Sequence, residues 1–195
     1  DSEVSDTEAV VSTIVSDNYD AGVQCAKDMM KKKTSANIII VNQKALNSIN
    51  ERVKGFRDTI KGHPQYKIVE EKESAAEFEI AMKVMEKIIY EKKNYDVVMG
   101  GNDPIALGCI AAMQMTDKTD QVMVYGVDGS PDGKAMIKAG FLEGTAAQSP
   151  IKIGEKAVQT AYSYLAGETV KKHVTIPVEL ITADNLKFYD MTGWQ

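Results

Sequence analysis

Polar side chains able to bind hydroxyl groups recur where short apolar runs of this sequence end. Ser16, Asn102, Asp128 and Gln148 each stand at such a point. An amide both donates and accepts hydrogen bonds, and a carboxylate can accept from two adjacent hydroxyls. The pattern therefore favours a site for a hydroxyl-rich ligand. The competing interpretation is an ordinary polar strand end for these residues.

Arg52 is the cation best placed to join such a site. It lies in the first turn or so of a predicted helix over residues 48–62, where the helix dipole disfavours a positive charge by ~0.3–1 kcal/mol. A cation at that end also faces the crevice beyond the strand ends, and a guanidinium can donate to two hydroxyls at once. The alternative is a solvated surface arginine.

Residue patterns for catalysis, cofactors or metals are weak. The sequence contains neither a G-x-G-x-x-G nor a G-x-x-x-x-G-K-[ST] motif, and His63 and His173 have no neighbouring Ser, Cys or acid. Cys25 and Cys109 lie among small helix residues, as buried structural thiols do. We therefore expect no enzyme activity, no cofactor and no metal site, with a carboxylate such as Asp128 ionised beside Arg52.

The elements that position these residues alternate between strand and helix. Each predicted strand is short and β-branched, and each predicted helix has apolar residues at 3.6-residue spacing. The alternation predicts an α/β fold with a mainly parallel sheet and helices on both faces. We expect helix N-caps at Asp17, Ser74, Asp103 and Asp128. The predicted strands are 9–15, 36–41, 66–70, 95–100, 121–126, 144–147 and 174–178, and the predicted helices are 18–32, 48–62, 74–92, 103–115, 131–139 and 150–166.

Composition excludes several classes of protein. The 195 residues are 44% hydrophobic and carry a net charge of −5 without a long Lys/Arg block, which argues against nucleic-acid binding. No apolar run approaches the ~20 residues that a membrane span needs. The length falls between one average domain and two, and the start at Asp1, without Met, suggests that a signal peptide or longer segment was removed.

Four motifs, in this order and spacing, resemble those of one family. They are NERVKGF at 50–56, GNDPIALG at 101–108, VYGVDGSP at 124–131 and AAQSP at 146–150. The chain resembles the type I periplasmic sugar-binding proteins, the ribose- and galactose-binding family of ABC import systems. The resemblance implies two α/β lobes that close on a monosaccharide or related polyol without chemistry. It also implies a membrane permease as partner and a periplasmic location, or an extracellular lipoprotein anchored to a Gram-positive cell.

The resemblance also implies ligand-binding residues and lobe boundaries. Phe78 stands two residues after the place, Ala76, where the family often has a ring-stacking aromatic; its alternative role is in the apolar stripe of its helix. Residues 17–148 and 180–195 would form a complete C-terminal lobe, with 1–16 and 149–179 as remnants of the N-terminal lobe. The implied ligand-binding residues are Arg52, Asn102, Asp128, Gln148, Ser16, Asp1 and Phe78.

The incomplete lobe has a consequence for packing and binding. Residues 149–178 would need the missing segment, a swapped neighbour or another complementing chain to cover them, and the chain alone would bind sugar weakly. Two alternatives stay open. One is the ligand-sensing core of a LacI-type transcription regulator without its DNA-binding head, and the other is a sugar- or nucleotide-modifying enzyme.

Overall fold

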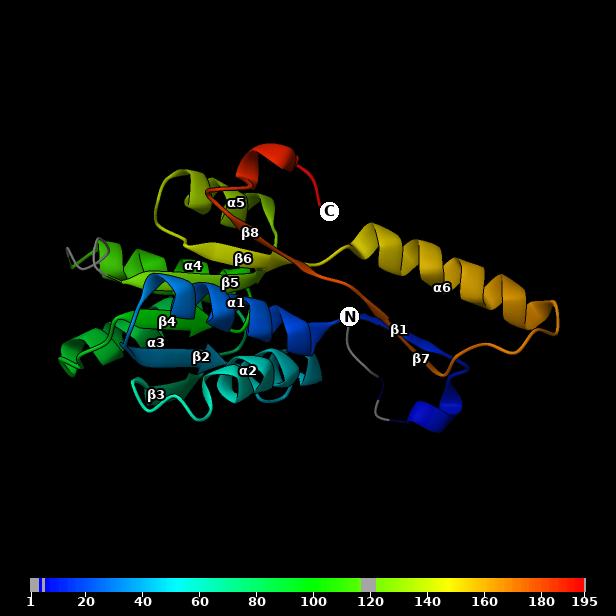
Figure 1. Ribbon diagram of the computed structural model, residues 1–195, viewed down its shortest axis with the longest axis horizontal. Coiled ribbons are helices and arrows are strands. Elements are labelled where there is room, and N and C mark those ends of the chain that lie inside the picture. The colour runs from blue at the N-terminus through cyan, green and yellow to red at the C-terminus, as the bar shows by residue number, and fades with distance from the viewer. Residues whose placement is uncertain (1–3, 5, 117–121, 195) are drawn as a thin grey trace.

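A computed structural model describes residues 4, 6–116 and 122–194 (Figure 1). Asp1 lies outside the described residues. Strands and helices alternate along the chain as the sequence pattern predicts. The elements are β1 (Thr13–Ser16), α1 (Asn18–Lys32), β2 (Ala36–Asn42), α2 (Asn47–Ile60), β3 (Tyr66–Glu73), α3 (Phe78–Tyr90), β4 (Val97–Gly100), α4 (Asp103–Gln114), β5 (Met123–Asp128), α5 (Pro131–Lys138), β6 (Gly144–Ala147), α6 (Pro150–Leu165), β7 (His173–Ile176) and β8 (Glu179–Thr182), with short 3-10 turns at Thr7–Ala9 and Leu186–Phe188.

Six strands form one sheet in the order β3-β2-β4-β5-β6-β8. Every neighbouring pair is parallel except β6 and β8, which are antiparallel. The strand order places the carboxyl ends of β2, β4, β5 and β6 along one edge of the sheet. The predicted α/β class with a mainly parallel sheet is confirmed.

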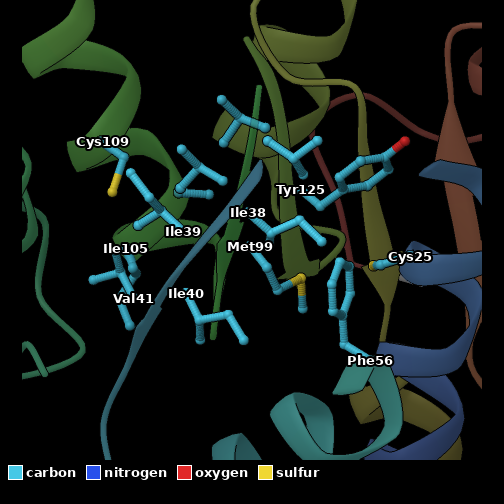
Figure 2. Packing of buried hydrophobic residues seen from close by; sticks show 14 of the residues in the cluster. Cys25, Ile38, Ile39, Ile40, Val41, Phe56, Met99, Ile105, Cys109 and Tyr125 are labelled. Carbon is cyan, nitrogen blue, oxygen red and sulfur yellow. The ribbon is translucent and has the colours of Figure 1, made fainter. Parts of the chain in front are cut away.

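Helices cover both faces of this sheet because its central strands are apolar on both sides. Figure 2 shows alternate residues of β2 pointing in opposite directions. Ile38 and Ile40 face Phe56 of α2, whereas Ile39 and Val41 face Ile105 of α4; all six are buried. An unbroken apolar strand of this kind is typical of a parallel sheet with helices on each face.

A second, two-stranded sheet lies apart from the first. β1 pairs with β7 in parallel, and these strands extend with α6 away from the six-stranded sheet (Figure 1). Helix α6 contributes no buried residue, and Tyr162 and Leu165 are 72% and 80% exposed. This part of the chain therefore has little core of its own.

Three of the four predicted helix caps are wrong. Only Asp17 caps its helix, by accepting from Asp20 N. Strand β3 continues beyond Glu70 to Glu73, so Ser74 does not cap α3. Helix α4 is capped by Asn102 and α5 by Ser130, because Asp103 is already helical and Asp128 still belongs to β5.

Candidate functional site

Three of the predicted ligand-binding residues form a hydrogen-bonded chain at the carboxyl ends of the strands. Asp128 ends β5 and Gln148 follows β6, and Gln148 Nε2 donates to Asp128 Oδ1 at 2.9 Å. Ser16, the last residue of β1, donates through Oγ to Gln148 Oε1 at 3.3 Å. A carboxylate oxygen accepts hydrogen bonds, so the Gln148 amide must direct its nitrogen at Asp128 and its oxygen at Ser16.

Arg52 extends this chain. Its NH1 lies 3.6 Å from Asp128 Oδ1 and donates to Gly101 O at 2.9 Å, while Nε donates to Asn18 Oδ1 at 2.9 Å. Asn18 in turn donates to the carbonyl of Ser16 at 3.2 Å. We call Ser16, Asn18, Arg52, Asp128 and Gln148 the polar ring, because their contacts form a closed circuit.

The position of Arg52 depends on close packing of α1 and α2. A side chain at Gly22 of α1 would collide with the carbonyl of Arg52, and one at Gly55 of α2 would collide with the carbonyl of Tyr19. With glycine at both contacts the two helix backbones touch, and the start of α2 comes within reach of Asn18. The surface interpretation of Arg52 is therefore wrong: the residue is 3% exposed.

The charges of the polar ring are largely removed from water. Burial lowers the pKa of Arg52, against the raising effect of Asp128 and Asp103. Burial raises the pKa of Asp128 to about 7; Arg52 opposes this rise and the charge of Asp103 adds to it. The expectation of a simply ionised Asp128 therefore needs correction, because near neutral pH its carboxyl exchanges between protonated and charged forms.

Asn102 and Phe78 are placed differently from the polar ring. Asn102 follows Gly101, whose carbonyl binds Arg52, but its own Oδ1 accepts from Ile105 N at 3.0 Å as the cap of α4. Its amide nitrogen lies 3.5 Å from Ala76 O. Phe78 is the first residue of α3 and is 38% exposed. A role in ligand binding stays a prediction for both.

Sequence reasoning missed two residues of this region. Asn18 is the first residue of α1, and the polar run Ser16-Asp17-Asn18 at the end of β1 and the start of α1 was the available signal. Asp103 was interpreted as a helix cap, yet it is fully buried and accepts a hydrogen bond from Thr145 Oγ1 at 2.7 Å. Its burial beside the β5–α5 turn is tertiary and has no local sequence signal.

A cavity of about 480 Å³ borders the polar ring at Ser16 and Asn18. Its other wall includes His173 and Thr175 of β7 and the start of α2, so it lies between the two sheets. Within the described ranges, no group of three or more His, Cys, Asp or Glu residues could hold a metal ion. Over the same ranges, no helix has both the length and the apolar character to cross a membrane.

Comparison with known proteins identifies the family. The model of the periplasmic binding protein domain matches residues 1–169. The chain belongs to the periplasmic binding protein family. The resemblance inferred from the four motifs is thus confirmed.

Curated relatives of this periplasmic binding protein are named as sugar import binding proteins. It is 31% identical to the ribose import binding protein of Escherichia coli over 175 residues, and this match covers 88% of this chain and 58% of the relative. It is also 31% identical over 195 residues to the D-apiose import binding protein of Paraburkholderia graminis, covering 98% of this chain and 62% of the relative. The chain thus spans about three fifths of the length of these relatives.

Solved structures agree on the fold. A solute-binding protein of an ABC transporter from Bacillus halodurans, solved with bound myo-inositol, matches with a TM-score of 0.90 and 25% identity, over 97% of this chain and 66% of that one. The Caulobacter myo-inositol binding protein matches with a TM-score of 0.81 and 28% identity, over 89% of this chain and 60% of that one. The predicted type I periplasmic-binding-protein fold is confirmed.

Proposed function

We propose that this protein is the extracytoplasmic substrate-binding component of an ABC importer and binds a monosaccharide or related polyol without chemical change. The observation that carries the proposal is the polar ring, in which Asp128 stands at the carboxyl end of β5 and Arg52 of α2 reaches the same edge by binding the carbonyl of Gly101 after β4. Ligands of open α/β sheets bind at that edge. Relatives named for ribose import, D-apiose import and D-allose binding support the same ligand class.

The chemistry of the polar ring suits hydroxyl groups. Asp128 binds Gln148 through Oδ1, and its carboxylate offers further lone pairs to a ligand. Arg52 is already fixed by Asn18 and Gly101, so binding costs it little side-chain entropy. Neither residue is paired with a nucleophile, and we infer that the site binds its ligand rather than transforms it.

Two lobes would contribute to this binding. We assign residues 17–148 and 180–195, which include the six-stranded sheet, to one lobe, and residues 1–16 and 149–179 to part of the other. Ser16 and Gln148 lie at two of the connections between them, so their hydrogen bond would couple lobe position to Asp128.

The second lobe would need a further protein segment to pack. A hollow of about 320 Å³ lies open on it, lined largely by apolar residues of α6, by Val11 just before β1 and by Ile14 of β1. A two-stranded sheet is marginally stable alone. We propose that additional chain of the same protein, a swapped copy or a complementing chain covers this surface.

Calorimetry with pentoses, hexoses and inositols tests the ligand class. The measurement is made on the natural protein and on the 195-residue chain, each with and without Asp128→Ala. If a lobe is incomplete here, the chain alone loses about 4 kcal/mol of hydrogen bonding, and its affinity falls about a thousandfold. The Asp128→Ala variant of the natural protein should not bind. Failure of every sugar and polyol to bind the natural protein would refute the proposal.

The partner and location follow from the same proposal. A permease in the membrane would receive the closed protein, and the protein would work in the periplasm or, anchored as a lipoprotein, outside a Gram-positive cell. The regulator alternative predicts a DNA-binding head in the natural protein and sugar-dependent binding to DNA. A gel-shift measurement with and without the bound sugar distinguishes the two.

A further inference from the structure

Asp103 adjoins Asp128, whose carboxyl accepts from the Asp103 backbone N–H, and it has no access to solvent. Its Oδ2 accepts from Ser130 N at 2.9 Å and from Ser130 Oγ at 2.6 Å, and its Oδ1 accepts from Thr145 Oγ1 at 2.7 Å. None of these donors belongs to α4, the helix that Asp103 begins. The carboxyl group therefore links α4 to the β5–α5 turn and to β6.

The two hydroxyls extend the reach of Asp103 to the neighbouring backbone. Thr145 Oγ1 accepts from Gly129 N at 3.0 Å, and Ser130 Oγ accepts from Gly133 N at 3.0 Å. A hydroxyl has one proton to give. Because Asp103 takes that proton in each case, the lone pairs of both oxygens are directed at the amides. Three backbone amides, those of residues 129, 130 and 133, thus end on Asp103 directly or through one hydroxyl.

The surrounding backbone leaves room for this carboxyl group and little else. A side chain at Gly126 would collide with Asp103 Oδ1, and one at Gly133 would collide with Oδ2. The turn is therefore closely fitted around Asp103, on the side of β5 as well as on the side of α5.

The residue that this network adjoins has a costly backbone conformation. Asp128 has a φ of +144°, and Gly129 follows with a φ of +70°. A non-glycine residue rarely adopts a positive φ, and such strain persists only where the surroundings enforce it. The hydrogen bonds to residues 129 and 130 begin directly after Asp128. In addition, the backbone N–H of Asp103 favours the charged form of Asp128.

We propose that Asp103 is the positioning residue of the site: it holds the 128–130 turn in the conformation that directs the Asp128 carboxyl at Arg52, Gln148 and the ligand. Asp103 itself does not touch the ligand. The identity of that ligand rests on the proposed function, whereas the positioning of Asp128 does not.

Two substitutions test the positioning of the turn in the ligand-free chain. Asp103→Asn keeps the size and shape of the side chain but places an amide N–H₂ opposite one of the groups, Ser130 or Thr145, that donate to the carboxylate. Thr145→Val removes one link and leaves every charge in place. In Asp103→Asn, amide exchange at residues 129, 130 and 133 should accelerate at least about tenfold. In Thr145→Val, amide exchange at Gly129 should accelerate equally. The reason is that each lost hydrogen bond involves a charged group or its direct partner. The amides of Ile38–Val41 should keep their protection.

The matched control is Asp96→Asn. Asp96 also binds a backbone amide, that of Asn37 at 2.8 Å, but it precedes β4 and lies at the opposite end of the sheet. The Asp96→Asn variant should leave amide exchange at residues 129, 130 and 133 unchanged. Carbon NMR of the Asp128 carboxyl supplies a second measurement: its pKa should fall below about 7 in Asp103→Asn, as a buried like charge is lost and the carboxyl is released, and stay unchanged in Asp96→Asn.

Binding of D-ribose or myo-inositol to the natural protein completes the test. Asp103→Asn and Thr145→Val should each weaken the affinity about tenfold or more, and Asp96→Asn should not. Wild-type exchange of the amides of residues 129, 130 and 133 in Asp103→Asn, together with wild-type exchange of Gly129 in Thr145→Val, would overturn the positioning role; if Asp103→Asn fails to fold, Thr145→Val decides. Accelerated exchange together with no sugar binding by the wild-type protein would instead refute the proposed function and leave the positioning of Asp128 intact.

Discussion

Arg52→Lys tests whether the ligand-free protein depends on the polar ring for its stability. Arg52 donates to Asn18 Oδ1 and Gly101 O through two different nitrogens, each at 2.9 Å, and lies 3.6 Å from Asp128. Lysine keeps the charge but concentrates its donors on one atom at the end of a flexible stem. The single Nζ has three N–H donors, but it cannot occupy the positions of both Arg52 nitrogens, so we expect one of the two acceptors to lose its donor.

The magnitude follows from these contacts. A hydrogen bond to a charged group contributes about 1.5–3 kcal/mol, and leaving a buried partner unsatisfied costs about 1–3 kcal/mol. For one lost bond in a site where Arg52 is 3% exposed, we expect about 3 kcal/mol. At ~2–4 °C per kcal/mol for a chain of this size, the Tm should fall by about 6–12 °C.

The control is the same substitution one and a half helix turns away. Arg57 of α2 pairs with Glu71 at 2.6 Å, but the two side chains are 46% and 28% exposed. Exposed pairs contribute ~0.2–1 kcal/mol, so Arg57→Lys should change the free energy of unfolding little. Urea unfolding followed by circular dichroism measures both variants. A difference between them below about 1 kcal/mol would show that the buried hydrogen bonds of Arg52 are replaceable, and the inferred packing of the site would be wrong.

Three further predictions concern the rest of the chain. The raised pKa of Asp128, about 7 in the folded state against ~3.9 unfolded, means that the folded form holds its proton more tightly, so stability falls as pH rises from about 4 to 7. Asp128→Asn should flatten the dependence of Tm on pH over this range, whereas Asp132→Asn, which replaces an exposed residue of α5, should not; equal slopes would contradict the buried state of Asp128. Amides of α6 should exchange faster than those of α2, because α6 buries no residue, and equal protection would mean that α6 is covered in solution. Burial raises the pKa of both thiols, that of Cys109 to about 12, so Cys25 and Cys109 should react with Ellman's reagent only as the chain unfolds; rapid labelling of the native protein would count against their burial.

The sheet could be predicted because its signals are local. The run Ile38–Val41 has no polar alternation, and that alone indicates a strand covered on both faces. Helix α1 was predicted with its observed bounds, from Asp17 as cap to the lysines at its end. Helix α5 was predicted from residue 131, where it begins, but its cap was misplaced at Asp128, although Ser130-Pro131, a cap residue followed by proline, is the stronger signal.

The polar ring could be predicted only in part, because its contacts join distant segments. Ser16 and Gln148 are 132 residues apart, and the circuit that Arg52 closes depends on two glycines at a helix contact. Periodicity says nothing about such pairings. Asp103 and Asn102 are both good cap residues, and only the burial of Asp103 against Ser130 and Thr145 determines which of them caps α4.

Stability alone does not account for the arrangement around Asp128. Its backbone has a positive φ, which costs folding free energy, and near neutral pH its raised pKa adds a cost that the buried Asp103 shares. A carboxylate with a purely structural role is expected to accept hydrogen bonds from protein donors on both oxygens, as Asp103 does from Ser130 and Thr145. Asp128 accepts from Gln148 Nε2 at 2.9 Å and from the backbone N–H of Asp103, but its Arg52 nitrogen lies at 3.6 Å, beyond normal hydrogen-bond distance, and 19% of its side chain stays exposed. Hydroxyl groups of a ligand would supply the donors that Asp128 lacks, so the strain at this residue is better explained by binding than by folding.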